Sequence, residues 1–346
     1  MNRNFILCIL VTFSLISNSC KKNTCCSIAA LSGSWINIAD IDSNLRSGAI
    51  SFVIDDAAYI GFGVNGNGHR LNDLWRFDTL TTNWFQLANC NGIGRSSAVG
   101  FSVNGKGYVA TGYDGSNMLN DTWQYDPSSN NWAQKANFPG TNRFDAVAFA
   151  IGNYGWVGTG YDGSDRNDFF KYDPSSDTWI QEMTCPGYAR SGAISFVYHD
   201  SAYLVTGQQN NGLEAGDFWR FDPNLNDSLK WRQLRHIYDY SPDSYDDSYT
   251  SIERYKGVGF VLLNTKSNGG GDRAYIATGA WGNGFSSAWG YNFATDVWYQ
   301  VDPIAPWPIQ GAVGFSVDNK GFVTTGILTA SEGEPLNGII EFFPDR

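Results

Sequence analysis

A sixfold internal repeat constrains the fold of this chain more than any other feature. Each repeat opens with small residues and ends its first run in Phe, at 46–52, 95–101, 143–149, 190–196, 254–260 and 309–315. A second run carries an aromatic residue and ends in Gly, and a third run has aromatics two positions apart. Aromatics at i and i+2 share one face of a β-strand. The repeat therefore predicts an array of small all-β units rather than unrelated domains.

The fourth strand of each unit is marked by Trp, and its count predicts how the ends of the chain meet. Five repeats supply it, as Trp84, Trp132, Trp179, Trp231 and Trp298. The sixth repeat ends after its third run at 339–343, but an unpartnered strand surrounds Trp35 before the first repeat. Pairing that N-terminal strand with the C-terminal sheet removes exposed edges. We therefore predict a six-bladed β-propeller over residues 31–346, with four antiparallel strands in each blade.

These residues resemble the Kelch family. The shared features are a period near 48, an aromatic residue before a Gly-ended second strand, a Tyr-Asp pair and a Trp about six residues later. The segment GYDGS…LNDTWQYDPSSNNW is similar to sequences of bacterial envelope propellers of the Kelch or galactose-oxidase central-domain type. The family usually ends its second strand in two glycines. The first of the two is replaced here by Phe62, Thr111, Thr159, Thr206, Thr278 or Thr325.

Composition agrees with this fold and excludes one class of partner. Charged residues are 16% of the chain, which contains 39 Gly and 53 aromatic residues (13 Trp, 18 Tyr and 22 Phe). Such a composition suits short strands and tight turns, and suits helices poorly. The net charge of −11 opposes binding to a phosphate backbone, which needs a basic surface. We therefore exclude nucleic acid as a partner.

The N-terminus is typical of an export signal. Arg3 precedes an apolar stretch from Phe5 to Ile16, which is too short to span a bilayer. Cys20, followed by two lysines, resembles a bacterial lipoprotein cleavage site. We predict a signal peptide at 1–19, lipidation of Cys20, a tether at 20–30, and anchoring of the exported protein in the bacterial outer membrane by that lipid alone. Plain secretion is the alternative, because Ser17 stands where such sites usually have Leu.

Arginines at the start of the innermost strands are the first candidates for a binding site. They occur in five of the six repeats, as Arg46, Arg95, Arg143, Arg190 and Arg254. Repeat symmetry would gather them around the mouth of the central channel, where guanidinium groups repel one another unless carboxylates or an anionic ligand compensate them. The Kelch resemblance implies contact with acidic ligands. The alternative is structural, with the arginines pairing to loop carboxylates such as Asp114 or Asp162 and holding neighbouring blades together.

Further residues are expected at the same mouth. Tyr113 and Tyr161 follow the Thr-Gly pairs directly, each with an aspartate after it, and Gln208 and Trp281 occupy similar places in later repeats. Aromatics beside polar groups suit a sugar or a peptide carboxylate, although the same aromatics could be packing residues. An insertion within 232–253 either overhangs the mouth as a partial lid or is a tolerated surface loop.

No catalytic motif stands out. Nucleophile elbows, phosphate loops and zinc spacings are absent from the sequence. His69 and His236 belong to different blades, and His199 lies on the turn side, so we predict neither a metal nor another cofactor. We predict a non-catalytic recognition or scaffold propeller of the cell envelope that binds a glycan, a peptide or a protein partner. The alternative is a sugar-acid mutarotase or epimerase resembling the Kelch-type sialic-acid mutarotases. Its acid–base group would come from the carboxylates Asp145, Glu182, Glu214 and Asp217.

Overall fold

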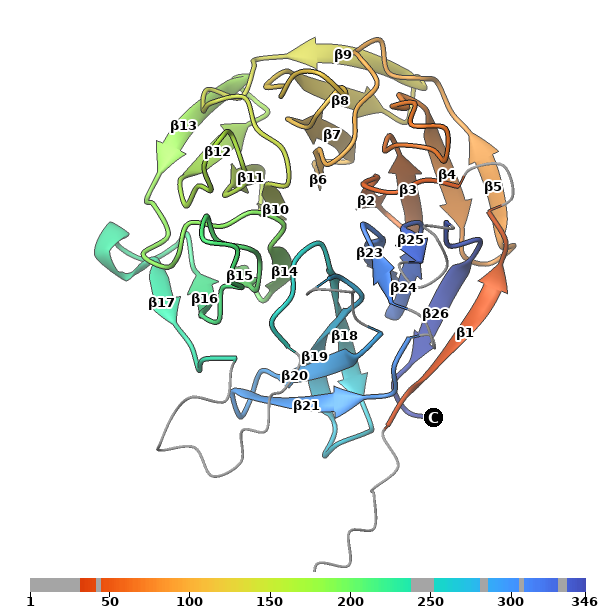
Figure 1. The fold of residues 1–346 in the computed structure, drawn as a ribbon, viewed down its shortest axis with the longest axis vertical. Coiled ribbons are helices and arrows are strands. Elements are labelled where there is room, and N and C mark those ends of the chain that lie inside the picture. Colours follow the sequence, from red (N-terminus) through yellow and green to blue (C-terminus); the bar gives the residue numbers. More distant parts are fainter. Residues whose placement is uncertain (1–31, 42–44, 238–251, 281–285, 305–307, 329–334) are drawn as a thin grey trace, which may run out of the picture. The chain divides into compact units, whose positions relative to one another are not determined.

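Short antiparallel strands joined by tight turns make up nearly all of the described chain (Figure 1). The computed structural model describes residues 32–41, 45–237, 252–280, 286–304, 308–328 and 335–346. The chain divides into two units, Met1–Ala30 and Leu31–Arg346, and all described residues belong to the second. The signal peptide, the tether and Cys20 predicted above lie outside the described residues.

Six four-stranded sheets are arranged in a ring, as the repeat predicted. Blade 1 contains β2 (Ile50–Ile54), β3 (Ala57–Gly61), β4 (Leu74–Asp78) and β5 (Asn83–Gln86). Blade 2 contains β6 (Val99–Val103), β7 (Lys106–Ala110), β8 (Thr122–Asp126) and β9 (Asn131–Lys135). Blade 3 contains β10 (Val147–Ile151), β11 (Tyr154–Gly158), β12 (Phe169–Asp173) and β13 (Thr178–Glu182).

The other three blades follow the same plan. Blade 4 contains β14 (Ile194–Tyr198), β15 (Ser201–Val205), β16 (Phe218–Phe221) and β17 (Trp231–Gln233), with the short 3-10 helix η2 (Asp227–Leu229) before β17. Blade 5 contains β18 (Val258–Thr265), β19 (Gly271–Ala277), β20 (Ala288–Asn292) and β21 (Val297–Val301). Blade 6 contains β23 (Val313–Val317), β24 (Lys320–Thr324), β26 (Ile339–Phe343) and β1 (Ser34–Ala39). A two-stranded ribbon of β22 (Ile309–Gln310) and β25 (Ile327–Leu328) accompanies it.

The N-terminal strand closes the ring, which confirms the predicted pairing of the chain ends. Strand β1 is the outer strand of blade 6, and Trp35 lies opposite Phe342 in the antiparallel register. The two rings are in contact, with centroids 4.5 Å apart and an angle of 38° between their planes. The indole nitrogen of Trp35 also donates to the Asp302 carbonyl 2.8 Å away, just after blade 5. Closure therefore joins the first strand of the chain to both of its last two blades.

Aromatic contacts within and between blades form the core. The Phe of each innermost strand packs on the aromatic of the neighbouring strand, and Phe101 and Tyr108 stack with centroids 5.2 Å apart. The same Phe then reaches the next blade, because a side chain at Gly155 would collide with the ring of Phe101. In blades 2, 3 and 6, Gly in the second strand thus makes room for the Phe of the blade before it, and the other three blades have Ala at this position.

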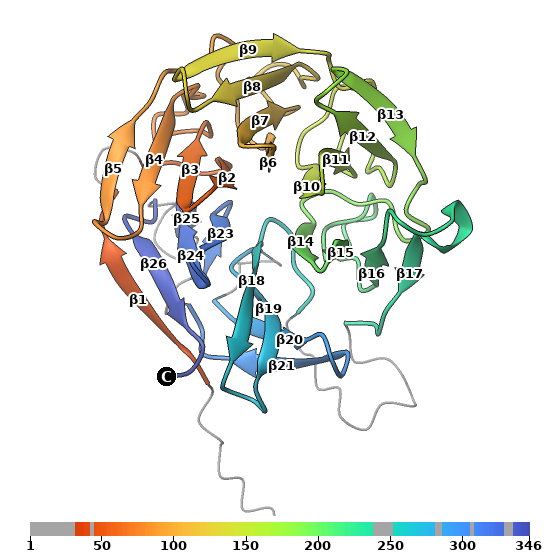
Figure 2. The same ribbon diagram turned by 180° about the vertical axis from the view of Figure 1, so that it is seen from behind.

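The ring has two distinct faces. Hairpins within a blade, such as Asn104–Gly105 with φ of 52° and 70°, have the two positive φ values of the tight turns that suit the strand twist. We call the face with these hairpins the turn face. Loops from the second to the third strand, and from each blade to the next, emerge on the opposite face, which we call the mouth face (Figure 2 gives the view from behind). In the described part of the chain, no helix is long and apolar enough to cross a membrane.

Candidate functional site

A closed circle of backbone hydrogen bonds surrounds the channel axis on the mouth face. Each blade contributes the third residue of its repeat, and all six have a left-handed backbone with φ between 53° and 69°. The six members are Gly48, Ser97, Asp145, Gly192, Lys256 and Gly311. Each amide donates to the carbonyl of the member before it, over 2.7 to 2.9 Å for five bonds and 3.4 Å for the bond from Gly311 to Lys256. We call this circle the mouth ring.

A cavity of about 380 Å³ lies at the mouth ring and draws its lining from all six blades. We call it the mouth cavity. Alanine and glycine at the next position of each repeat keep the axis open, and a narrower space of about 180 Å³ continues between the innermost strands. The mouth cavity is within the size range of small-ligand sites. Its principal polar side chains are Arg70, Tyr113, Asp145, Lys256 and Gln310.

An ion pair spans one side of the mouth cavity. The ammonium group of Lys256 in blade 5 lies 2.8 Å from a carboxylate oxygen of Asp145 in blade 3, and Gly192 of blade 4 separates the two members of the ring. The side chain of Lys256 is 31% exposed, whereas that of Asp145 is 11% exposed. Lysine has three donor positions, so the ammonium group can bind a ligand while it holds this carboxylate.

Arg70 is the guanidinium group that does line the mouth cavity. It comes from the loop between β3 and β4, and its guanidinium carbon lies 5.6 Å from the centre of the Tyr113 ring. One terminal nitrogen donates to the Gly68 carbonyl at 2.9 Å. The Nε atom is buried and has no hydrogen-bond partner among the described residues. An arginine donor without a partner beside a cavity is suited to an acceptor on a ligand.

The five repeat arginines lie elsewhere, contrary to the prediction that they ring the mouth. Their side chains are at most 3% exposed, and none of them lines the mouth cavity. Four pair with an aspartate just before the third strand of their own blade, and the first three of these pairs have two hydrogen bonds each: Arg46 with Asp73, Arg95 with Asp121, Arg143 with Asp168, and Arg190 with Asp217. In the last pair, the second carboxylate bond is replaced by one from the Tyr188 amide to Asp217.

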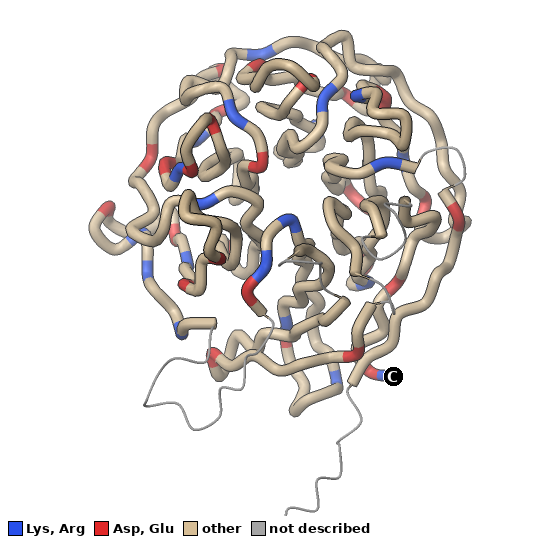
Figure 3. The backbone as a smooth tube through the Cα atoms, viewed as in Figure 1, with Lys and Arg blue, Asp and Glu red and all other residues tan. Residues whose placement is uncertain are grey.

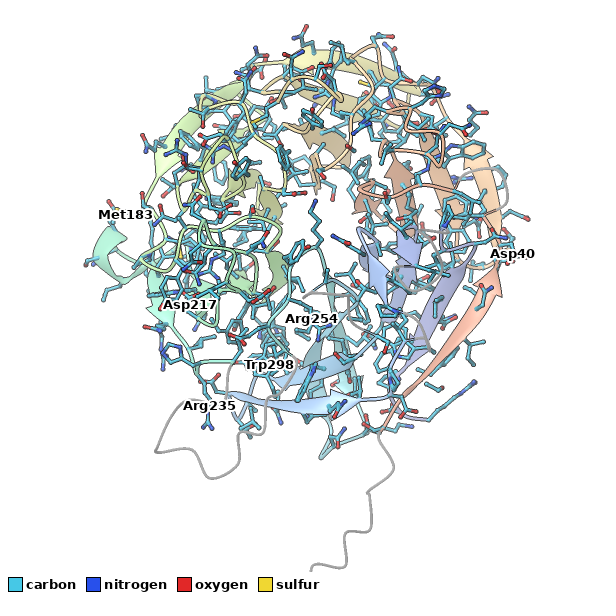
Figure 4. All side chains as sticks on the ribbon, in the orientation of Figure 1. Asp40, Met183, Asp217, Arg235, Arg254 and Trp298 are labelled. Atoms are coloured by element: carbon cyan, nitrogen blue, oxygen red, sulfur yellow. The ribbon has the colours of Figure 1, made fainter. Side chains whose placement is uncertain are left out.

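The fifth arginine has a different environment. Arg254 donates to the carbonyl and hydroxyl oxygens of Ser287, at 2.9 and 3.0 Å, where the other blades have Asp. Burial lowers the pKa of Arg254 to about 9. Figure 4 labels Arg254 together with Asp217, the aspartate of the preceding blade. The structure therefore supports the structural alternative for these arginines, with carboxylates other than Asp114 and Asp162.

A second set of bonds explains why arginine recurs at this position. In blade 3, Arg143 donates to the carbonyl of Thr159 at 2.9 Å, and Thr159 has a left-handed φ of 58°. The carbonyl of Arg143 itself accepts a bond of 2.8 Å from Gly112 of blade 2. The equivalent bonds recur in the blades with Arg46, Arg95, Arg190 and Arg254. Each arginine thus fixes a strained backbone residue and links neighbouring blades.

The other predicted residues divide between the mouth cavity and its surroundings. Tyr113 lines the cavity, and its ring contacts Phe144, which in turn contacts Tyr161 outside the lining. Asp114 accepts bonds from two amides of its own turn, which lower its pKa. Gln208 pairs through its backbone with Ser191. Trp281 lies outside the described residues.

Of the other candidate carboxylates, one lines the mouth cavity and the others do not. Asp162 pairs with Arg166 at 2.7 Å rather than with a repeat arginine. Burial of Asp162 raises its pKa, but the bonds to Arg166 and Thr141 outweigh that effect and lower it. Glu214 lies in a mouth-face loop, and burial raises its pKa. Of the proposed acid–base candidates, Asp145 is the one that lines the mouth cavity.

Most of the insertion expected to overhang the mouth, residues 238–251, lies outside the described residues. Glu253, at its end, is described: burial and then the charge of Glu214 raise its pKa to about 7. Charged positions of both signs are interspersed around the ring (Figure 3). Among the residues that the structure describes, no group of three or more His, Cys, Asp or Glu could hold a metal ion.

Sequence reasoning missed Arg70, Lys256, Phe144 and Gln310. A signal for Lys256 was present, because it is a charged residue, like the candidate Asp145, at the third position of a repeat that otherwise carries Gly or Ser. A charge at a position where the repeat requires a left-handed backbone is unusual. Arg70 has no equivalent in the other repeats, so its position depended on the three-dimensional structure.

Comparison with known proteins supports the fold. Residues 17–188 match the KLHDC2/KLHL20/DRC7 Kelch-repeats domain, and this match and the six-bladed ring together support the Kelch propeller family. No curated protein sequence matches the chain. The solved structure of YjhT is similar, with 16% sequence identity and a TM-score of 0.68 over 85% of this chain and 94% of that chain. A likeness at this identity shows the fold alone.

Proposed function

We propose that this Kelch-repeat propeller is a non-catalytic recognition protein that binds an acidic glycan or peptide in the mouth cavity. The observation that carries the proposal is the guanidinium group of Arg70, whose buried Nε atom has no described partner beside the cavity. A carboxylate on a ligand would satisfy this donor. The recognising cation is thus Arg70 and not one of the five repeat arginines.

Charge supports an acidic ligand. The charged side chains that line the mouth cavity are Arg70, Lys256 and Asp145, which sum to one positive charge in a chain with a net charge of −11. Tyr113 and Phe144 add aromatic surface to the same lining. Aromatic surface with a few placed polar groups is typical of small-ligand sites. A sugar or peptide that carries a carboxylate would use both features.

Sugar-acid mutarotation is the second candidate, and one observation favours it. Asp145 is a carboxylate in the same cavity as Arg70, so a bound sugar acid could meet a proton-transferring group there. The ammonium group of Lys256 lies 2.8 Å from this carboxylate and pairs with it. Mutarotation needs a proton acceptor and a proton donor at the sugar ring, and Asp145 is the one carboxylate among the described residues that line this cavity. Recognition without catalysis is therefore the leading proposal.

The proposed location of the protein follows from its N-terminus. An export signal ending at residue 19 and a lipid on Cys20 would anchor the propeller to the bacterial outer membrane through the tether at 20–30. The propeller would then present its mouth to glycans, peptides or protein partners of the cell envelope. Metabolic labelling with a radioactive fatty acid tests the lipid: the native chain should incorporate the label, and a Cys20→Ser variant should not.

A binding screen tests the recognition. The full chain should be applied to an array of acidic and neutral glycans and peptides, and compared with the Arg70→Met variant. Loss of a charge-assisted hydrogen bond should weaken binding of the best acidic compound about tenfold or more. Arg166→Met is the matched control, because Arg166 is an ion-paired arginine of the mouth face outside the cavity lining. Equal binding by native protein and Arg70→Met would overturn the proposal.

A further inference from the structure

A second cavity, separate from the mouth cavity, lies on the turn face between blades 3 and 4. Its volume is about 400 Å³, and we call it the blade 3–4 cavity. Figures 1 and 2 show these two blades, β10–β13 and β14–β17, side by side in the ring. The hairpin between β10 and β11 and the loop between β16 and β17 both contribute to its lining. The side chains that matter for its chemistry are Tyr154, Trp156, Lys171, Glu182, Asp200 and Lys230.

Blade 3 differs from its neighbours at one cross-strand position. In blade 2, Tyr108 lies opposite Gln124, and the Gln124 amide donates to the Tyr108 hydroxyl at 2.5 Å. In blade 3, Trp156 lies opposite Lys171 at the same register. Indole and ammonium groups are both donors with no acceptor. Neither group can accept a hydrogen bond from the other. Where blade 3 has Trp and Lys in place of Tyr and Gln, each donor therefore needs an acceptor from elsewhere.

The indole nitrogen of Trp156 has no partner in the part of the chain that the structure describes. The residue is 2% exposed, so bulk water cannot easily satisfy the N–H group. A buried donor left without an acceptor costs free energy comparable to a lost hydrogen bond. Trp156 lines the blade 3–4 cavity, which is the available space for such an acceptor.

Two lysines share one carboxylate in this cavity. Glu182 lies 2.9 Å from the ammonium group of Lys230 and 3.5 Å from that of Lys171. Burial lowers the pKa of Lys230, but hydrogen bonds to Glu182 and Asp227 outweigh that effect and raise it. Lys230 also pairs with Asp227 at 3.0 Å, but that carboxylate is 74% exposed and is screened by water. The three less exposed side chains, Lys171, Lys230 and Glu182, carry one net positive charge, and each ammonium group retains a free donor position.

Aromatic surface lies beside these charges. The ammonium group of Lys171 is 4.9 Å from the centre of the Tyr154 ring, and Tyr154 remains 38% exposed. Glu182 and Asp200 are acceptors in the same lining. The cavity thus offers donors for a carboxylate, acceptors for hydroxyl groups and an aromatic surface for an apolar ring face.

We infer that the blade 3–4 cavity binds a sugar acid, a polyhydroxylated ring that carries a carboxylate. The carboxylate would accept from Lys171, Lys230 and the Trp156 indole, and ring hydroxyls would donate to Glu182 or Asp200. A neutral sugar would leave the positive charge uncompensated. A carboxylate on a plain hydrocarbon ring would offer no hydroxyl donor to Glu182 or Asp200.

Isothermal titration calorimetry of the full chain with three probes tests this ligand class. Glucuronate carries both hydroxyls and a carboxylate, glucose carries hydroxyls alone, and cyclohexanecarboxylate carries a carboxylate alone. Glucuronate should bind at least tenfold more tightly than either of the other two, because charged and hydroxyl partners each contribute. Equal or weaker binding of glucuronate would overturn the inference.

Variants assign the binding to this cavity. Trp156→Phe keeps the ring and removes the N–H group, and it should weaken glucuronate binding about fivefold to tenfold. Lys171→Met should weaken it by at least as much. Lys320→Met is the matched control, because Lys320 forms an ion pair of the same 3.5 Å length with Glu341 on the turn face of blade 6. That control should bind glucuronate normally.

The mouth variant separates this inference from the proposed function. If glucuronate binding is unchanged in Trp156→Phe and Lys171→Met but lost in Arg70→Met, the sugar acid binds at the mouth and the blade 3–4 site is wrong. If glucuronate binding is lost in Trp156→Phe and Lys171→Met but unchanged in Arg70→Met, the sugar acid binds in the blade 3–4 cavity, and this result does not depend on what the mouth cavity binds. Circular dichroism of each variant should match the native spectrum, and a second variant, Tyr154→Leu, replaces Trp156→Phe if that protein does not fold.

Discussion

Arg95 and Asp121 form a buried pair joined by two parallel hydrogen bonds. The terminal guanidinium nitrogens of Arg95 donate to the two carboxylate oxygens of Asp121 over 2.6 and 2.7 Å. The Arg95 side chain is fully buried, and Trp123 donates a third bond to the same carboxylate at 2.6 Å. Burial alone would raise the pKa of Asp121, but Arg95 and Trp123 outweigh it and lower the pKa. The pair is therefore part of the structural core of blade 2.

Arg95→Met should destabilise the propeller rather than weaken a ligand. Removal of one partner leaves a poorly solvated carboxylate, which should lower the free energy of unfolding by about 3–5 kcal/mol. The double variant Arg95→Met/Asp121→Leu should recover part of the loss, because no lone charge remains. Urea denaturation measures both.

Arg70→Met is the control for the stability of this pair, since Arg70 forms no ion pair with a carboxylate of the described residues. It should change the free energy of unfolding by less than about 1 kcal/mol. Equal stability of Arg95→Met and the native protein would show that the repeat arginines do not hold the blades.

The architecture was predictable because the repeat keeps the residues on which packing depends. Phe101 and Gly155 show the reason: one ring occupies the space of one missing side chain in the next blade. The Phe recurs in all six repeats, and the position of Gly155 holds only Gly or Ala. The closing strand at Trp35 could be found by counting alone. Because each blade needs four strands, the one strand missing from the sixth repeat could be matched to the extra strand at the N-terminus.

The site was harder to predict because sequence neighbours are not spatial partners. Asp114 was expected beside an arginine, but its carboxylate accepts hydrogen bonds from the amides of Ser116 and Asn117 in the turn that it begins. Asp121 is the last residue of the loop between the second and third strands of blade 2, and there its carboxylate meets Arg95. Its equivalents, Asp73, Asp168 and Asp217, recur in three other repeats, so this pairing did have a sequence signal.

Thr159→Gly should stabilise the protein. Thr159 is β-branched at a φ of 58°, and its buried hydroxyl has no partner among the described residues. A left-handed backbone costs such a residue about 1–2 kcal/mol, so Gly should raise the free energy of unfolding by about 1 kcal/mol despite the lost side-chain contacts. Thr159→Val keeps the left-handed strain and should gain less. Thermal unfolding of the three proteins would contradict this account if the Gly variant melted below the native protein.

Glu253 should make stability depend on pH. Burial, followed by the nearby Glu214, raises its pKa from 4.5 to about 7. The folded state therefore favours the neutral acid, so its contribution is complete below pH 4.5 and is lost as the pH rises through 7. Because the group is partly exposed, Glu253→Gln should gain about 1–2 kcal/mol over the native protein at pH 8 and little at pH 4.

Urea denaturation at several pH values measures this gain. Asp56→Asn, at an exposed carboxylate on the turn face, is the control and should show the same difference from native at every pH. A Glu253→Gln difference that is also constant with pH would show that the carboxyl group is not held in its neutral form.

Trp35→Ala should test the closure of the ring. The variant removes the ring contact with Phe342 and the bond to the Asp302 carbonyl, and should lower the free energy of unfolding by about 3 kcal/mol. Ile36→Ala, on the same strand with 38% exposure, should cost less than about 1 kcal/mol. Similar losses for both variants would indicate that β1 does not close the propeller as observed.

A crystal structure of the full chain with the best acidic compound from the binding screen tests the central claim most directly. The account predicts electron density on the channel axis, with an acidic group of the ligand within hydrogen-bond distance of Arg70 and the Arg95–Asp121 pair intact. Density at the rim of the ring, or a ligand carboxylate that displaces Asp121 from Arg95, would contradict it.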